Sequence, residues 1–130
     1  MILADSDVLI DALRGRSPAR ERIESELVTG RLATTVISVY ELLSGARTEK
    51  ERAKVELLLD ALTALPLDDE AARRAAQVDR ALAEAGQRLA PADTLIAGIC
   101  LSRSAILLTR NRKHFARVPN LSLSRIDADE

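Results

Sequence analysis

The chain begins with a short apolar run that leads directly into acidic residues. Residues 2–4 are apolar and are followed at once by Asp5. From Asp7 onward the apolar positions have the spacing of a helix, and Gly15 ends that pattern. These patterns predict a short buried strand over residues 2–4 and a short helix that stops at Gly15. Asp5 therefore lies where a strand passes into a helix, and in an open α/β sheet that is the edge at which ligands bind.

Strand-like and helix-like segments alternate along the rest of the chain. Such alternation predicts an α/β fold, with a mainly parallel sheet and helices on both of its faces. The length predicts a single domain over residues 1–130. The expected strands are 2–4, 32–35, 65–67, 106–108 and 121–124, and the expected helices are 7–13, 18–29, 36–46, 49–62, 68–85 and 91–101.

Several local features of these elements can also be predicted. Ser17 is expected to cap the second helix, with Pro18 as its first residue. The helix over 36–46 is apolar along most of its length and is expected to be largely buried. Residues 111–115 are predicted to form a basic loop, and residues 121–124 alternate like an edge strand.

The charge is balanced overall but unevenly distributed. The 130 residues carry a net charge of −1, so the chain lacks the global signature of a nucleic-acid-binding protein. Residues 94–126 nevertheless contain no acid. A basic segment of this kind is able to contact phosphate, and it is also compatible with a solvated surface that acidic helices balance elsewhere. The basic residues of the segment are Arg103, Arg110, Arg112, Lys113, Arg117 and Arg125.

Other residue types narrow the possible classes of protein. One tyrosine, one phenylalanine and no tryptophan argue against modules that stack single-stranded bases on aromatic side chains. The single cysteine, Cys100, lies in an apolar stretch and is expected to be a small buried hydrophobe. An unpaired cysteine fits a reducing compartment, so we expect a cytoplasmic protein. The longest apolar run, residues 95–101, is far too short to span a membrane.

Three carboxylates have unusual surroundings. Asp5 follows the first strand, Glu41 lies among apolar residues of the helix after the second strand, and Asp93 lies in the first turn of an apolar helix. A parallel sheet would bring all three to one edge. Each also has a structural interpretation, because Asp5 and Asp93 are at helix starts and Ser38 with Glu41 has the spacing of a capping box. Both interpretations stay open for each residue.

A divalent cation would remove the repulsion between such carboxylates. Mg²⁺ prefers a few carboxylate oxygens and several waters, which leaves coordination positions for a phosphate oxygen. A bound Mg²⁺ can generate hydroxide and stabilise the charge of an in-line displacement. The single histidine, His114, excludes a metal-free ribonuclease that uses a histidine pair. One cysteine and one histidine do not provide a typical zinc site.

Four segments of the chain together resemble a known family. They are residues 5–11 (DSDVLID), 38–42 (SVYEL), 91–97 (PADTLIA) and 108–115 (LTRNRKHF). In this order and at these separations, they resemble the PIN domain, and within it the VapC toxins of bacterial type II toxin–antitoxin systems. The resemblance covers essentially the whole chain. It implies a three-layer α/β/α sandwich around a short, mainly parallel sheet.

The resemblance also implies an activity and partners. It implies an Mg²⁺- or Mn²⁺-dependent endoribonuclease that cuts structured RNA, commonly a tRNA or rRNA loop. It implies a homodimer and a VapB-type antitoxin whose C-terminal segment blocks the acidic pocket. The metal ligands of the family correspond to Asp5 and Asp93, and its acidic helix residue corresponds to Glu41. We therefore assign these three acids to a catalytic metal site.

The last motif departs from the family at one position. Many members have an acid immediately before the phenylalanine, where this chain has His114. Asn111 is expected to join the catalytic group, as a neutral oxygen ligand or by orienting water. The basic side chains around it are expected to contact RNA phosphates. An alternative function is a PIN-like module that binds metal and its partner but has lost RNA turnover at His114. The expected phosphate contacts are Arg110, Arg112, Lys113 and Arg117.

Overall fold

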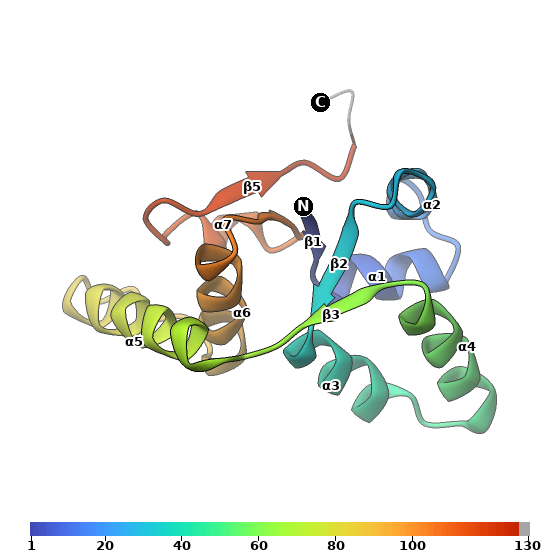
Figure 1. Cartoon of the computed structure of the whole chain (residues 1–130), viewed down its shortest axis with the longest axis horizontal. Coiled ribbons are helices and arrows are strands. Elements are labelled where there is room, and N and C mark those ends of the chain that lie inside the picture. Colours follow the sequence, from blue (N-terminus) through green and yellow to red (C-terminus); the bar gives the residue numbers. More distant parts are fainter. Residues whose placement is uncertain (128–130) are drawn as a thin grey trace.

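The computed structural model describes residues 1–127 and contains one five-stranded sheet flanked by helices (Figure 1). Residues 128–130 are part of the predicted single domain but lie outside the described residues. No helix within residues 1–127 is both long and apolar enough to cross a membrane. The strands are β1 (Ile2–Ala4), β2 (Leu32–Thr35), β3 (Thr63–Leu65), β4 (Ile106–Leu108) and β5 (Ser122–Ser124). The helices are α1 (Ser6–Leu13), α2 (Ala19–Thr29), α3 (Val36–Gly45), α4 (Glu49–Asp60), α5 (Asp69–Glu84), α6 (Pro91–Ser102) and α7 (Arg112–Phe115).

All strand pairs of the sheet are parallel, in the order β3-β2-β1-β4-β5. This confirms the predicted α/β fold. Strands β1 to β3 follow one another in one direction from the centre, whereas β4 and β5 lie on the other side of β1. The topological switch point is therefore between β1 and β4, where neighbouring crossovers diverge and leave a crevice beyond the strand ends. Asp5 and Thr109 are the first residues after these two strands.

The two faces of the sheet bury separate apolar clusters, because side chains alternate between the faces along each strand. Leu3 and Leu107 pack in the cluster that includes α5 and α6, whereas Ile2 and Leu108 pack in the cluster that includes α1 and α2. Figure 1 shows these helix groups on opposite sides of the sheet. The predicted three-layer α/β/α arrangement is therefore confirmed, and Cys100 is buried in the α5–α6 layer as expected.

The expected element boundaries agree with the structure within two residues, and two of the differences have a clear physical reason. The third strand ends at Leu65, because Pro66 has no backbone N–H with which to continue the ladder. Helix α2 begins at Ala19, and Ser17 makes no capping bond to its backbone. The Ser17 hydroxyl instead donates to Glu21 Oε1 at 2.6 Å, so it links two side chains.

Two predicted environments also differ from the structure. Helix α3 is not largely buried, since only Ser38 and Leu42 are fully covered and Tyr40 is 71% exposed. The segment expected to be a basic loop contains the short helix α7. Phe115 anchors α7 because its ring is completely buried in the α5–α6 layer. The edge position of β5 is confirmed.

A close helix crossing gives a testable prediction about stability. A Cβ atom added at Gly98 in α6 would lie 2.5 Å from the backbone oxygen of Ala71 and 2.7 Å from the Cβ atom of Ala75 in α5. The backbone of α5 would have to shift to make room for this atom. We therefore expect Gly98→Ala to lower the free energy of unfolding by about 1–3 kcal/mol. The matched control is Gly45→Ala at the end of α3, where a Cβ meets nothing within 4 Å. Urea denaturation of both variants tests this, and equal stabilities would contradict it.

Candidate active site at the ends of β1 and β4

Asp5 is the central acid of the candidate site. Its backbone N–H donates to the Leu108 oxygen at 2.9 Å, which ties the end of β1 to the end of β4. Its carboxylate accepts from the Ser6 backbone N–H at 2.8 Å and from the Thr109 hydroxyl at 2.8 Å. The Ser6 contact makes Asp5 the N-cap of α1, so the capping interpretation is correct. The contact with Thr109, 104 positions away, shows that the same carboxylate also lies in the crevice at the switch point.

The environment of Asp5 favours its neutral form. The side chain is buried, with 6% of the residue exposed. Burial raises the pKa of Asp5 from 3.8 to about 7, and the negative charges of Asp7 and Asp93 add to this rise. The donors at Thr109 and Ser6 oppose the rise in the Asp5 pKa but do not cancel it. A buried acid held in this way is typical of functional sites, because a nearby cation would allow it to ionise.

Asp93 approaches the site from the first turn of α6. Its Oδ2 accepts from Asn111 Nδ2 at 3.3 Å, and Asn111 Oδ1 is hydrogen-bonded to His114 Nδ1. Burial raises the pKa of Asp93, and a charge on His114 opposes that rise. The structure therefore brings Asp93 and Asn111 together, as the sequence predicted. Asp93 lies in the first turn of α6, where an acid complements the helix dipole, and its carboxylate also accepts from the amide of Asn111, 18 positions away.

Glu41 reaches the same region through Ser6. The Ser6 hydroxyl donates to Glu41 Oε1 at 3.1 Å, linking the middle of α3 to the start of α1. The capping-box interpretation of Glu41 is wrong, because Thr35 caps α3 by accepting from the Ser38 backbone N–H at 3.1 Å. The Glu41 carboxylate therefore has no capping role, and it is hydrogen-bonded to Ser6, the residue that follows Asp5.

Asp7 is part of this site, although its sequence position alone had not indicated a function for it. Its Oδ2 accepts from the Arg110 backbone N–H at 3.1 Å and lies 3.4 Å from the Thr109 hydroxyl. Its Oδ1 is buried and has no hydrogen-bond partner within residues 1–127. Burial raises the pKa of Asp7. The Asp-x-Asp spacing after a buried strand is the sequence signal that would have pointed to it.

The four basic residues expected to contact RNA occupy different environments. Arg110 Nη1 pairs with Asp11 at 2.8 Å and its Nε lies 4.0 Å from Asp7, so this guanidinium already has acidic partners. The Nη1 atom of Arg112 is buried without a hydrogen-bond partner among the described residues. Lys113 is exposed. Arg117 is partly exposed, and its Nη1 contacts the Gln87 oxygen at the long distance of 3.5 Å.

The acidic residues do not form a preassembled metal cage. Within residues 1–127, no three Asp, Glu, His or Cys side chains converge closely enough to hold a metal ion by themselves. Mg²⁺ does not require such a cage, because it commonly binds through one or two carboxylates and keeps several waters. The raised pKa values of Asp5, Asp7 and Asp93 and the unpartnered Oδ1 of Asp7 fit a site whose charge a cation would neutralise.

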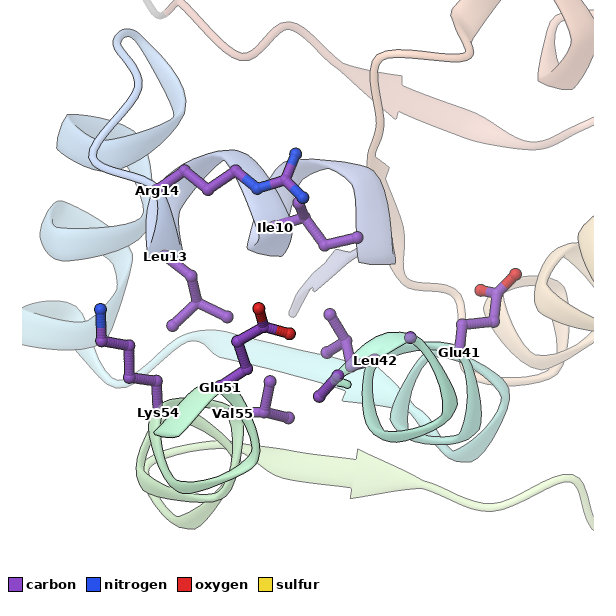
Figure 2. A pocket seen from close by; sticks show the side chains of 10 residues that line it. Ile10, Leu13, Arg14, Glu41, Leu42, Glu51, Lys54 and Val55 are labelled. Atoms are coloured by element: carbon purple, nitrogen blue, oxygen red, sulfur yellow. The ribbon is translucent and has the colours of Figure 1, made fainter. Parts of the chain in front are cut away.

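A groove adjoins this site on the surface. It encloses about 270 Å³ between α1, α3 and α4. Figure 2 shows the apolar side chains of Leu13, Leu42 and Val55 converging from these three helices, with Glu41 at the groove end that is farther from α4. Arg14, Glu51 and Lys54 provide charges along the same groove, which therefore has an apolar floor and a charged rim.

Known proteins resemble this chain over most of its length. Ribonuclease VapC10 of Mycobacterium tuberculosis is 40% identical over 115 residues, which cover 88% of this chain and 86% of that protein. The tRNA(fMet)-specific endonuclease VapC of Salmonella typhimurium is 30% identical over 93% of this chain and 94% of its own length.

Structural comparison leads to the same family. A chain in the crystal structure of DNA-bound VapBC from Salmonella typhimurium superimposes with a TM-score of 0.88 at 28% identity, covering 97% of this chain and 98% of that one. The sequence pattern of the PIN domain matches residues 2–121. The chain described here therefore belongs to the PIN-domain family, and its relatives within that family are VapC proteins.

Proposed function

We propose that this protein is the ribonuclease toxin of a VapB–VapC pair and that it hydrolyses RNA phosphodiester bonds at the Asp5–Asp93 site. The observation that carries this proposal is the buried carboxylate of Asp5 at the switch point, with its pKa raised to about 7 and Asp93 close by. The names of the VapC relatives support the proposed ribonuclease activity. The position of Asp5 and Asp93 in the site at the ends of β1 and β4 supports their assignment to the active site.

Asp5 and Asp93 are the residues proposed to hold Mg²⁺ or Mn²⁺, with Glu41 acting directly or through a bound water. When bound, the metal ion supplies an activated water and stabilises negative charge on the phosphate. Thr109 holds the Asp5 carboxylate at 2.8 Å, and Asn111 holds Asp93 at 3.3 Å, so both acids are oriented in advance. Attack of water on the phosphorus with departure of the 3′-oxygen is proposed, which would leave 5′-phosphate and 3′-hydroxyl ends.

RNA is proposed to approach over α7 and the loop before it. Lys113 and Arg117 are available to phosphates, whereas the Arg112 guanidinium nitrogen that has no partner among the described residues is buried and would have to turn outward to reach one. Arg110 would have to exchange its ion pair with Asp11 for a phosphate. The proposed substrate is a structured RNA such as a tRNA or rRNA loop. One relative is named a tRNA(fMet)-specific endonuclease.

The proposed partner is a VapB-type antitoxin. Solved structures that resemble this chain include VapBC complexes. The groove between α1, α3 and α4 has an apolar floor suited to an amphipathic segment, and it leads to Glu41 at the edge of the acidic site. A segment bound there would block access to Asp5. Homodimerisation and a cytoplasmic location, which the family resemblance and the composition imply, stay predictions.

RNA cleavage by the purified protein without antitoxin tests this proposal. We expect cleavage with Mn²⁺ or Mg²⁺, none with a chelator, and inhibition when the cognate antitoxin is added. Asp93→Asn keeps the shape of the side chain but removes its charge, so we expect cleavage to fall by about 10²–10⁴-fold. Unchanged cleavage by an Asp5→Asn, Asp93→Asn double variant would contradict the proposal. No cleavage by the wild type, with cleavage by His114→Asp, would favour the non-catalytic binding module.

A further inference from the structure

The only histidine of the chain is connected to the acidic site through one intermediate side chain. His114 lies on the exposed side of α7, and its Nδ1 is hydrogen-bonded to Asn111 Oδ1. Asn111 Nδ2 in turn donates to Asp93 Oδ2 at 3.3 Å. An imidazole, an amide and a carboxylate thus form a continuous chain from the surface to the site.

The chemistry of the three groups fixes the direction of each hydrogen bond. An ionised carboxylate only accepts, so the Asn111 amide must turn its Nδ2–H₂ toward Asp93. This orientation places the amide oxygen, which only accepts, against His114 Nδ1. The imidazole must therefore carry a proton on Nδ1. A reversed amide would set two acceptors against each other at Asp93, so the network allows one arrangement.

We infer that His114 is a positioning residue for Asp93, because its Nδ1–H locks the Asn111 amide and the amide holds Asp93 Oδ2. The other oxygen of Asp93, Oδ1, would then be left to hold a divalent cation, directly or through its water. This inference rests on the proposed function. It gives His114 a role different from that of an acid at the same position, since the imidazole acts through Asn111 and touches neither the metal nor the reacting phosphate.

The tautomer of His114 provides a test in the metal-free protein. Because the chain has one histidine, the long-range proton–nitrogen NMR spectrum contains one pair of ring nitrogen signals. At an alkaline pH where an imidazole is neutral, we expect the proton on Nδ1 in the wild type and a loss of this preference in Asn111→Ala. A wild-type ring protonated on Nε2 would overturn the inference.

A matched pair of substitutions tests the effect on metal binding. In His114→Asn, the side-chain amide nitrogen takes the place of the imidazole Nδ1. In His114→Gln, the amide nitrogen takes the place of Nε2 instead. We expect His114→Asn to bind Mn²⁺ within about threefold of the wild type. We expect His114→Gln and His114→Ala to bind it about 10–100-fold more weakly by calorimetry, the usual effect of losing a group that orients a ligand. Equal losses in all three variants would overturn the inference.

A double-mutant cycle separates action through Asn111 from direct action. In an Asn111→Ala background, we expect the additional substitution His114→Ala to change Mn²⁺ affinity by less than about twofold, since the connecting amide is already absent. Multiplicative losses would show that His114 acts by another route and would contradict the inference. Thermal unfolding of each variant checks that the fold is retained.

The outcomes distinguish this inference from the proposed function. If the wild type neither binds Mn²⁺ nor cuts RNA with it, the proposed function fails, and the inference fails with it. If the wild type does both and His114→Ala matches it in both assays, only the role of His114 is overturned.

Discussion

Asp5→Asn is expected to abolish RNA cleavage while making the protein more stable at neutral and alkaline pH. The substitution keeps the acceptor for the Ser6 N–H, and its amide can donate to the Thr109 hydroxyl in place of the bond observed between them. It removes the buried charge. Loss of a group at the reacting centre is expected to lower the cleavage rate by about 10²–10⁴-fold.

The pH dependence of this gain in stability follows from the raised pKa of Asp5. Burial raises that pKa from 3.8 to about 7, so between these values the folded protein keeps a proton that the unfolded chain has lost. The stability of the wild type therefore falls as the pH rises from about 4 through about 7. Above that interval we expect Asp5→Asn to be more stable by about 2–4 kcal/mol, and below pH about 4 we expect little difference.

Urea denaturation between pH 4 and pH 9, with a chelator present, measures this difference. Glu24→Gln is the matched control, because Glu24 is an exposed acid on α2 and its substitution should change stability by less than about 0.5 kcal/mol. Adding Mg²⁺ should stabilise the wild type at neutral pH but not Asp5→Asn, since a ligand stabilises only the form that binds it. An Asp5→Asn variant that is less stable than the wild type at pH 8 would refute the buried-charge explanation.

Thr109→Val is expected to damage both the stability of the fold and the activity of the site. The Thr109 side chain is completely buried, and its hydroxyl donates to Asp5 at 2.8 Å and accepts from the Asn111 backbone N–H at 3.0 Å. Valine has nearly the same shape but leaves both partners without this bond. We expect a loss of about 1–3 kcal/mol in the free energy of unfolding. We also expect about 10–100-fold slower cleavage, because Asp5 and Asn111 lose their common support.

Thr109→Ser is the matched control for this experiment. Serine keeps the hydroxyl and removes one methyl group, which should cost about 1 kcal/mol and leave most of the cleavage activity. In denaturation at pH 6 and pH 8, Thr109→Val should lose more free energy of unfolding at pH 8. At that pH Asp5 is ionised, and the hydrogen bond from the Thr109 hydroxyl stabilises the ionised carboxylate more strongly than the neutral acid. Equal effects of the two substitutions on cleavage would mean that the hydroxyl does not support the site.

The candidate site could be predicted only in part from the sequence. Asp5 and Asp93 were identifiable because each is an acid at the start of a helix, next to apolar residues. Glu41 stayed ambiguous until the structure showed Thr35, rather than the Ser38–Glu41 pair, at the cap of α3. Asp7 was missed as a site residue although the Asp-x-Asp spacing after the first strand is a signal for it, because its partner in the loop after β4 is 103 positions away and the sequence alone does not show that contact.

Basic residues illustrate the same limit. Arg110 belongs to an acid-free segment and was predicted to contact RNA, yet in the structure it pairs with Asp11 across 99 positions.

Helix α3 was expected to be largely buried because its residues are apolar, whereas Tyr40 is 71% exposed. Composition tells how apolar a helix is, but the packing of other elements decides which of its faces is covered.

The sequence by itself determined the alternation of strands and helices, the parallel α/β fold and the acids at the starts of helices, because these depend on local spacing of apolar and polar residues. The tertiary structure alone decided which distant groups meet. It placed Thr109 on Asp5 and Asn111 between Asp93 and His114. The physical reason is that strand order decides which strand ends become neighbours, and burial at the switch point then raises the pKa of Asp5.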